Sequence, residues 1–158
     1  MTPNRRATAI IADDEPRLAA YLRERLAELW PDLVVAGVAA NGPEAQALIA
    51  AEGPDIAFLD IRMPGLSGLD VAKSAGRDVH VVFVTAFDEY AVDAFERAAV
   101  DYLLKPVSDA RLAQTIERLR QRLAGEQAAP GLRAVLATLA ELAPGLVDLD
   151  NVVLIPHL

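Results

Sequence analysis

Residues 56–65 read Ile-Ala-Phe-Leu-Asp-Ile-Arg-Met-Pro-Gly: an apolar run, a carboxylate at Asp60, and then a break at Pro64-Gly65. A short apolar run between turn residues is typical of a buried β-strand. Asp60 should therefore lie at the carboxyl end of a strand, where we expect its side chain to face solvent. A single carboxylate in that place is usually a strand terminator or a helix cap, so its meaning depends on the residues around it.

The pattern of this strand is repeated on both sides of it along the chain. Short apolar runs predict further strands at 7–12, 33–39, 80–85 and 102–104. Amphipathic or Ala-rich segments predict helices at 16–29, 44–52, 69–74, 89–99 and 109–123. Parallel strands need crossover connections, and these are right-handed. Five strands alternating with five helices therefore predict an α/β fold in which helices cover both faces of a parallel sheet.

The composition excludes several classes of function. The 158 residues are 53% hydrophobic, which is enough for a substantial core. A formal net charge of -8 makes the chain a poor binder of nucleic acid, whose phosphates attract an excess of Lys and Arg. There is no cysteine for disulfides, thiolate metal sites or thiol catalysis, and His80 and His157 lack the spacing of metal ligands. No apolar stretch reaches the roughly 18 residues of a membrane span, so we expect a cytoplasmic protein.

The chain divides into one domain and an appendage. We assign residues 1–124 to the domain, 125–131 to a linker that ends at Pro130-Gly131, and 132–158 to an extra helix and an apolar tail. The appendage is too short to bury a core of its own. It either packs on the domain, pairs with another chain, or leads into a further domain.

Polar residues gather where the predicted strands end. In chain order they are Asp13, Asp14, Glu15, Asp60, Thr85 and Lys105. Ligands of a parallel sheet bind at this edge, and clustered carboxylates repel one another at neutral pH unless a cation is present. Oxygen ligands in an open site suit Mg²⁺, with Mn²⁺ as an alternative. The metal would neutralise a phosphoryl donor, Asp60 would attack the donor to form an acyl phosphate, and Thr85 and Lys105 would bind the phosphoryl oxygens.

Four motifs together carry a family resemblance. They are Asp13-Asp14-Glu15, Asp60-Ile-Arg-Met-Pro-Gly, Thr85-Ala86 and Lys105-Pro106. In this combination and order they resemble the receiver domain of bacterial two-component response regulators, over residues 7–123. The resemblance implies a flavodoxin-like fold with strand order 2-1-3-4-5.

The resemblance also implies a role for each site residue. Asp60 would be the phosphoacceptor, and Thr85 and Lys105 would bind the phosphoryl group. The implied Mg²⁺ ligands are Asp13, Asp14, Asp60 and the backbone carbonyl of Arg62. The remaining implied features are assistance from Glu15 and Ala86, an aromatic switch at Tyr102, and a cis peptide bond before Pro106.

A narrower resemblance lies in residues 84–107. The pieces Thr-Ala-Phe-Asp-Glu-Tyr-Ala and Asp-Tyr-Leu-Leu-Lys-Pro are similar to receivers of the LytTR class, whose effector is a DNA-binding domain that this sequence does not contain. The implied partners are a sensor histidine kinase and, only through such an effector, DNA. Phosphorylation would alter the face made by the fourth helix, the fifth strand and the fifth helix. Its mixed charges could pair across a homodimer: Glu96, Arg97, Asp101, Arg111, Glu117 and Arg118.

Three other functions are alternatives to this signalling phosphoacceptor, which is not an enzyme. A Mg²⁺-dependent phosphohydrolase would carry its nucleophile on the first strand in an Asp-x-Asp arrangement, with a cap over its substrate. This chain has adjacent Asp13-Asp14 and no cap insertion. A stand-alone receiver that acts by protein-protein contact without phosphorylation would not need Asp60, Thr85 and Lys105 together. A nucleotide-binding function would need a Gly-rich loop after the first strand, where none occurs.

Overall fold

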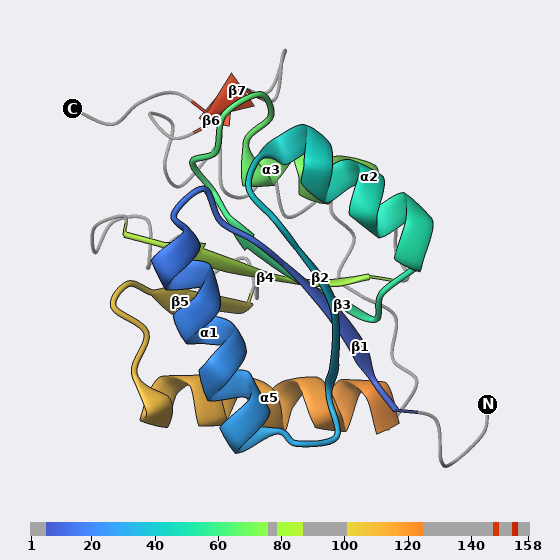
Figure 1. The fold of residues 1–158 in the computed structure, drawn as a ribbon, viewed down its shortest axis with the longest axis vertical. Helices are drawn as coiled ribbons and strands as arrows, with labels where there is room; N and C mark the ends of the chain where they lie inside the picture. The colour runs from blue at the N-terminus through green and yellow to red at the C-terminus, as the bar shows by residue number, and fades with distance from the viewer. Residues whose placement is uncertain (1–5, 76–78, 87–100, 125–146, 149–152, 155–158) are drawn as a thin grey trace.

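Five parallel strands form the centre of the molecule. The computed structural model describes residues 6–75, 79–86, 101–124, 147–148 and 153–154. The strands are β1 (Thr8–Ala12), β2 (Val34–Ala39), β3 (Ile56–Asp60), β4 (His80–Thr85) and β5 (Asp101–Leu104). They lie in the order β2-β1-β3-β4-β5 with every neighbouring pair parallel (Figure 1). The flavodoxin-like α/β fold and its strand order are confirmed.

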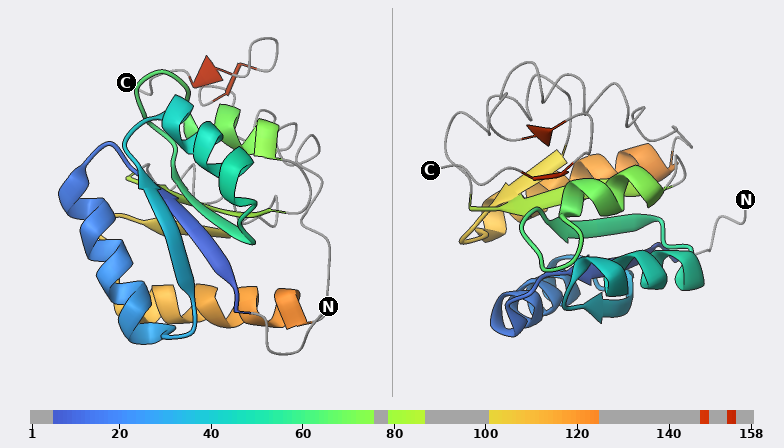
Figure 2. Two further views of the ribbon diagram at one scale, coloured as in Figure 1. Left: turned by 45° about the vertical axis from the view of Figure 1, so that its right-hand side comes forward. Right: turned by 90° about the horizontal axis from the view of Figure 1, so that it is seen from above.

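Helices cover both faces of this sheet, as predicted. The described helices are α1 (Pro16–Leu29), α2 (Gly42–Glu52), α3 (Gly68–Ala75) and α5 (Asp109–Ala124). The α1 and α5 helices lie on one face, and α2 and α3 lie side by side on the other (Figure 2). None of these described helices combines the length and the apolar character that crossing a bilayer would require.

Several predicted elements fall outside the described residues. These are the helix at 89–99, the linker at 125–131 and the helix that begins at 132. Of the predicted tail, the structure describes β6 (Val147–Asp148) and β7 (Val153–Leu154), which pair antiparallel.

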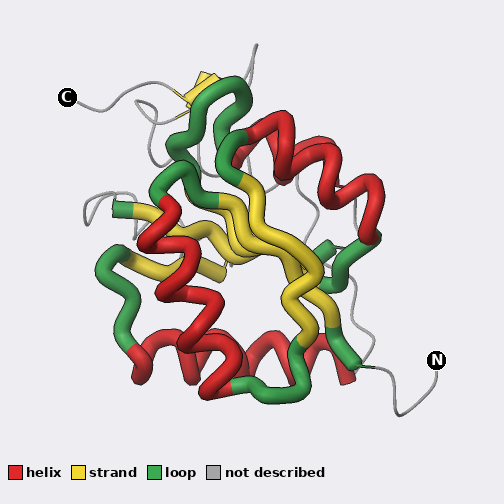
Figure 3. Tube along the Cα trace, in the orientation of Figure 1, coloured by secondary structure: helices red, strands yellow, loops and turns green. Residues whose placement is uncertain are grey.

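The core explains why the central strands read as unbroken apolar runs. All five residues of β3 are buried, because helices pack on both of its faces. Ala57 and Leu59 belong to the cluster beneath α2 and α3, whereas Phe58 belongs to the cluster beneath α1 and α5. Figure 3 shows the strands between these two helical layers. Because apolar side chains fill both faces of the sheet, polar functional groups are expected at its edges.

The turn before α2 is built from a short polar sequence. The Oδ1 atom of Asn41 accepts a hydrogen bond from the amide of Glu44 at 2.8 Å, and Pro43 suits the first turn of a helix. The helix therefore begins at Gly42, two residues before the predicted start. Gly53 ends it with φ 52°, a left-handed conformation that glycine adopts without strain. The turn at 41–43 is thereby held at the carboxyl edge of the sheet.

Candidate functional site

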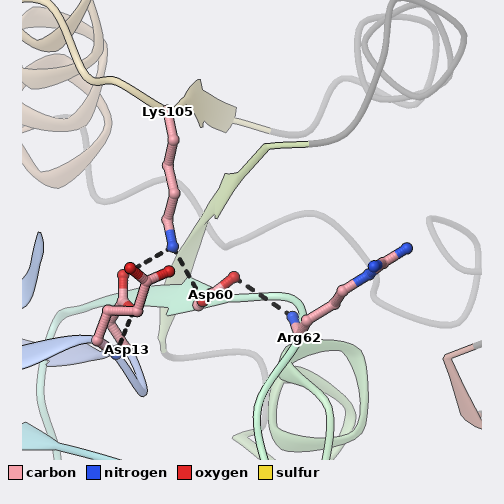
Figure 4. A network of polar contacts seen from close by, with 5 residues as sticks. Asp13, Asp60, Arg62 and Lys105 are labelled. Atoms are coloured by element: carbon pink, nitrogen blue, oxygen red, sulfur yellow. Dashed lines mark hydrogen bonds and ion pairs between the residues drawn. The ribbon is translucent and has the colours of Figure 1, made fainter. Parts of the chain in front are cut away.

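Three of the predicted site residues meet at the carboxyl edge of the sheet. The Nζ atom of Lys105, which follows β5, lies 3.0 Å from Oδ2 of Asp13 and 3.0 Å from Oδ2 of Asp60 (Figure 4). Asp13 follows β1 and Asp60 ends β3, so the ammonium joins residues from three strands. Asp13 and Asp60 are each only 6% exposed. The prediction that these strand ends converge is correct.

Asp60 is buried, so the expectation that its side chain faces solvent is wrong. Neighbouring strand ends and the Lys105 side chain cover a carboxylate that would be exposed at an isolated strand end. Burial is the main cause that raises the pKa of Asp60 from 3.8 to about 6, although Lys105 opposes it. The amide of Arg62 donates to Oδ1 of Asp60 at 3.3 Å, while the Arg62 side chain extends away from the site (Figure 4).

Lys105 remains a cation in this setting. Burial alone lowers the pKa of an ammonium group. Here hydrogen bonds and attraction from Asp13 and Asp60 outweigh burial and raise the pKa of Lys105 above 10.5. The site therefore holds one permanent positive charge between two buried carboxyl groups.

The acidic residues after β1 have the chemistry of a magnesium site. One carboxylate oxygen from each of Asp13, Asp14 and Glu15 lies within 4.8 Å of the others. Asp13 is buried, and its Oδ1 accepts a hydrogen bond from the amide of Glu15 at 2.9 Å, whereas Asp14 and Glu15 are exposed. Hard oxygen donors that leave one side open to water suit Mg²⁺, which keeps several waters when bound. The donor set therefore fits this ion.

The residues proposed for the phosphoryl group and the switch lie on the last two strands. Thr85 ends β4, is 3% exposed, and its carbonyl accepts from the amide of Lys105 at 2.9 Å. Tyr102 pairs with Phe83 on the neighbouring strand and is also buried, with the guanidinium of Arg111 4.6 Å from its ring centroid.

Two smaller predictions at this edge concern Ala86 and Pro106. Ala86 is exposed directly after β4. The peptide bond between Lys105 and Pro106 is cis, the isomer that the family resemblance implies.

His80 and Asp101 lie apart from these groups. His80 begins β4 at the opposite, amino edge of the sheet and is buried, so it serves as a packing residue rather than a surface residue. Asp101 was expected among the surface charges that could pair across a dimer, and the expectation that it lies at the surface is wrong. It is 3% exposed and forms ion pairs within its own chain, with Arg118 Nε at 3.3 Å and with Arg122.

The spacing of two arginines in the sequence is a signal for this pairing. Arg118 and Arg122 are four residues apart on α5, so they share one face of the helix. A face with two arginines beside an edge strand is a natural partner for a carboxylate at the start of that strand. Glu96 and Arg97, the other charges expected near it, lie outside the described residues.

The turn at Asn41–Pro43 also reaches the site, and it was not among the predicted site residues. The carbonyl of Ala39, just before it, accepts from the amide of Asp13 at 3.0 Å. The amide of Gly42 donates to the carbonyl of Pro64 at 3.1 Å, in the loop that follows Asp60. An Asn-Gly-Pro sequence predicts a turn, but nothing local in it reveals which distant loop the turn will touch.

The fold and this edge define a class: flavodoxin-like domains with an acidic cluster, a buried aspartate and a lysine at the carboxyl ends of the strands. The model of the response regulator receiver domain family matches residues 9–117. This chain therefore belongs to the response regulator receiver domain family.

Individual proteins agree with this assignment. An uncharacterized response regulatory protein of Vibrio cholerae is 50% identical over 123 residues, which are 76% of this chain and 47% of that protein. The transcriptional regulatory protein BtsR of Escherichia coli is 45% identical over 114 residues, 71% of this chain and 47% of BtsR. The chain thus spans about half the length of these curated relatives.

Solved structures show the same fold. The receiver domain of AraT from Geobacillus stearothermophilus superposes with a TM-score of 0.67 at 30% identity, covering 78% of this chain and 99% of that one. The signal receiver domain of NarL from Mycobacterium tuberculosis gives a TM-score of 0.63 at 28% identity, covering 74% and 98%. Receiver domains are in general signalling phosphoacceptors rather than enzymes, and this chain is consistent with that role.

Proposed function

We propose that this chain is the phosphoacceptor of a two-component system, in which Asp60 receives a phosphoryl group from a sensor histidine kinase in the presence of Mg²⁺. The observation that carries the proposal is the Lys105 ammonium, 3.0 Å from both Asp13 and Asp60 at the carboxyl edge of the sheet. A buried nucleophile, a second carboxylate and a mobile cation are the groups that phosphoryl transfer to a carboxylate requires.

The nucleophile is an Asp60 carboxylate oxygen, and the donor is a phosphohistidine. The oxygen attacks phosphorus, the bond between phosphorus and the imidazole nitrogen breaks, and that nitrogen keeps the electron pair. With a pKa of about 6, Asp60 is mostly ionised at neutral pH. It is also more basic than an exposed aspartate, which favours attack. Lys105 then pairs with the oxygens of the bound phosphoryl group, and Thr85 donates its hydroxyl to them.

Mg²⁺ would be held by Asp13, Asp14, Asp60 and the backbone carbonyl of Arg62, with Glu15 assisting and Mn²⁺ as an alternative ion. When bound, the ion neutralises the phosphoryl oxygens and orients the donor for in-line attack. Asp14 is the exposed member of the acidic pair, so it can accept a hydrated ion with little rearrangement.

The conformational change that follows phosphorylation begins at Thr85 and Tyr102. Both side chains are buried on adjacent strands, β4 and β5. When the Thr85 hydroxyl turns towards the phosphoryl group, the space beside it becomes available to the Tyr102 ring, and Ala86 lies next to this movement. The changed face involves β5 and α5, and we propose that it forms a homodimer. Among the described charges, Arg111 and Glu117 are exposed or partly exposed there, whereas Asp101 and Arg118 pair within the chain.

The regulated process is transcription, and the class is LytTR. The motifs within 84–107 support the class. The name of BtsR, a transcriptional regulatory protein, supports the process. In this proposal residues 1–124 are the receiver, 125–131 a linker and 132–158 the lead-in to a DNA-binding effector, the part of the protein that would touch DNA.

The test is to incubate the chain with acetyl phosphate, with Mg²⁺ or with EDTA, and to weigh the intact protein. A single adduct of one phosphoryl group that needs Mg²⁺ and is absent in Asp60→Asn is expected. An adduct that persists in Asp60→Asn would place the acceptor elsewhere. Sustained turnover of a phosphoester substrate would favour the phosphohydrolase instead.

A further inference from the structure

The turn between β2 and α2 packs closely against the loop that follows Asp60, and backbone atoms of the two segments are in contact. A Cβ atom added at Gly42 would lie 2.2 Å from the carbonyl oxygen of Leu66 and 2.5 Å from its Cβ. A Cβ atom added at Gly65, which has φ 86°, would lie 2.6 Å from Cδ of Pro43. Atoms at such distances overlap, so the turn at 41–43 and the loop at 61–67 approach as closely as glycine allows.

The loop has little freedom at its base. The amide of Gly68 donates to the carbonyl of Ile61 at 2.8 Å, and a Cβ atom at Gly68 would lie 2.2 Å from the carbonyl oxygen of Asp60. Inside this closed loop, Arg62 donates its amide to the Asp60 carboxylate at 3.3 Å. Arg62 therefore lies inside a closed loop, between the Asp60 carboxylate and the point at Leu66 where the turn makes its close approach.

The same turn is also tied to the other half of the site. The Ala39 carbonyl holds the amide of Asp13 at 3.0 Å, and the Gly42 amide holds the Pro64 carbonyl at 3.1 Å. Residues 39–43 thus bridge Asp13 and the loop after Asp60. The turn cannot move aside easily, since Asn41 caps α2 and Ala45 is fully buried. If the turn did move, it would pull on Asp13 instead.

We propose that Gly42 is a positioning residue for the metal site: its missing side chain lets residues 39–43 contact both Asp13 and the loop that carries Arg62, which fixes these two groups relative to each other. This rests on the proposed function, in which Asp13 and the Arg62 carbonyl bind the ion. Gly42→Ala pushes the loop or the turn outward and separates the two groups. Groups that orient metal ligands typically change metal affinity by 10-fold or more, so the variant should bind Mg²⁺ about tenfold more weakly.

The experiment compares Gly42→Ala with Gly53→Ala, at the other end of the same helix. Gly53 has φ 52°, and no atom lies within 4 Å of a Cβ placed there. Gly53→Ala is therefore strained but not crowded, and it reports the loss of stability without pressure on the site. Mg²⁺ affinity is measured by calorimetry, phosphorylation by acetyl phosphate is followed across Mg²⁺ concentrations, and stability is measured by urea unfolding.

Gly42→Ala is expected to raise the Mg²⁺ dissociation constant and the Mg²⁺ concentration for half-maximal phosphorylation, whereas Gly53→Ala lowers only the urea midpoint. If Gly42→Ala does not fold, Pro43→Ala replaces it as the test variant. This substitution removes the ring that touches Gly65 and loosens the contact without crowding it. It should also weaken Mg²⁺ binding. Equal Mg²⁺ affinity in wild type, Gly42→Ala and Pro43→Ala overturns the inference. A wild-type chain that neither binds Mg²⁺ nor accepts a phosphoryl group overturns the proposed function instead.

Discussion

Asp60→Asn should make the metal-free protein more stable, and the gain should depend on pH. An aspartate whose pKa is raised in the folded state opposes folding once it is ionised, because the unfolded chain holds the charge in water at no such penalty. Folding stability is therefore lost as pH rises from about 4 through the folded pKa of about 6. Asparagine keeps the shape of the side chain and carries no charge to desolvate.

The magnitude follows from the two pKa values of Asp60. They differ by 2.2, from 3.8 to about 6, and each pKa unit corresponds to about 1.36 kcal/mol. The folded protein is then destabilised by roughly 3 kcal/mol at pH 8, and by only about 0.5 kcal/mol at pH 4, where about two fifths of the unfolded carboxyl groups are also protonated. The attraction of Lys105 is already contained in the folded value, and Lys105 keeps Asp13 as a partner in the variant.

The assay is urea unfolding in EDTA at pH 8 and at pH 4, followed by the fluorescence of Trp30. It is the single tryptophan of the chain and is 5% exposed. Asp60→Asn should unfold at a higher urea concentration at pH 8 and close to wild type at pH 4. The matched control is Asp14→Asn, an exposed carboxylate of the same site, which should change metal-free stability by less than about 0.5 kcal/mol. A gain that is equal at both pH values, or a loss at pH 8, refutes the reasoning.

Three further substitutions test other contacts, each by urea unfolding in EDTA. Asp101→Asn should destabilise the fold by about 2 kcal/mol, because it removes a buried carboxylate from Arg118 and Arg122. The loss is limited because both arginines are partly exposed and can recover some hydration. An unchanged urea midpoint would contradict this prediction. Thr115→Val should stabilise by about 1 kcal/mol, since the buried Thr115 hydroxyl finds no hydrogen-bond partner among the described residues, and a loss would show a partner that valine cannot replace. Lys105→Gln should destabilise the metal-free protein by about 2 kcal/mol, because Asp13 and Asp60 lose their cationic partner. Added Mg²⁺ should restore part of that stability by binding these carboxylates. No response to Mg²⁺ would argue against the metal site.

Where the sequence predicted the structure well, one local pattern was enough. The unbroken apolar run of β3 indicated a strand buried on both faces, and the turn residues after Asp60 marked where it ends. Parallel strands place their carboxyl ends at one edge, so Asp13, Asp60 and Lys105 could be expected to converge before any distance was known.

Where the sequence predicted poorly, the deciding contact joins residues far apart in the chain. The burial of Asp60 depends on Lys105, 45 residues away. From the sequence alone Asp101 is expected to be a surface charge, but in the fold α5 places Arg118 and Arg122 next to it. The close approach of Gly42 to Leu66 follows from how α2 and α3 pack side by side, and no periodicity in the sequence records it.

The charges of the site explain why one lysine is present and why a divalent ion is still needed. By formal charge, the proposed metal ligands Asp13, Asp14 and Asp60 together with Lys105 carry about -2, so a phosphoryl donor would be repelled. Two positive charges from Mg²⁺ bring the site to about zero before transfer. The acyl phosphate carries up to about two negative charges in place of the single negative charge of Asp60. The additional negative charge lies beside the Lys105 ammonium. Lys105 lies 3.0 Å from each of two carboxylates in the metal-free protein, so it can leave Asp13 to the metal and follow the new charge on Asp60. A second fixed lysine would satisfy the carboxylates permanently and remove the reason for the site to bind either Mg²⁺ or a phosphoryl group.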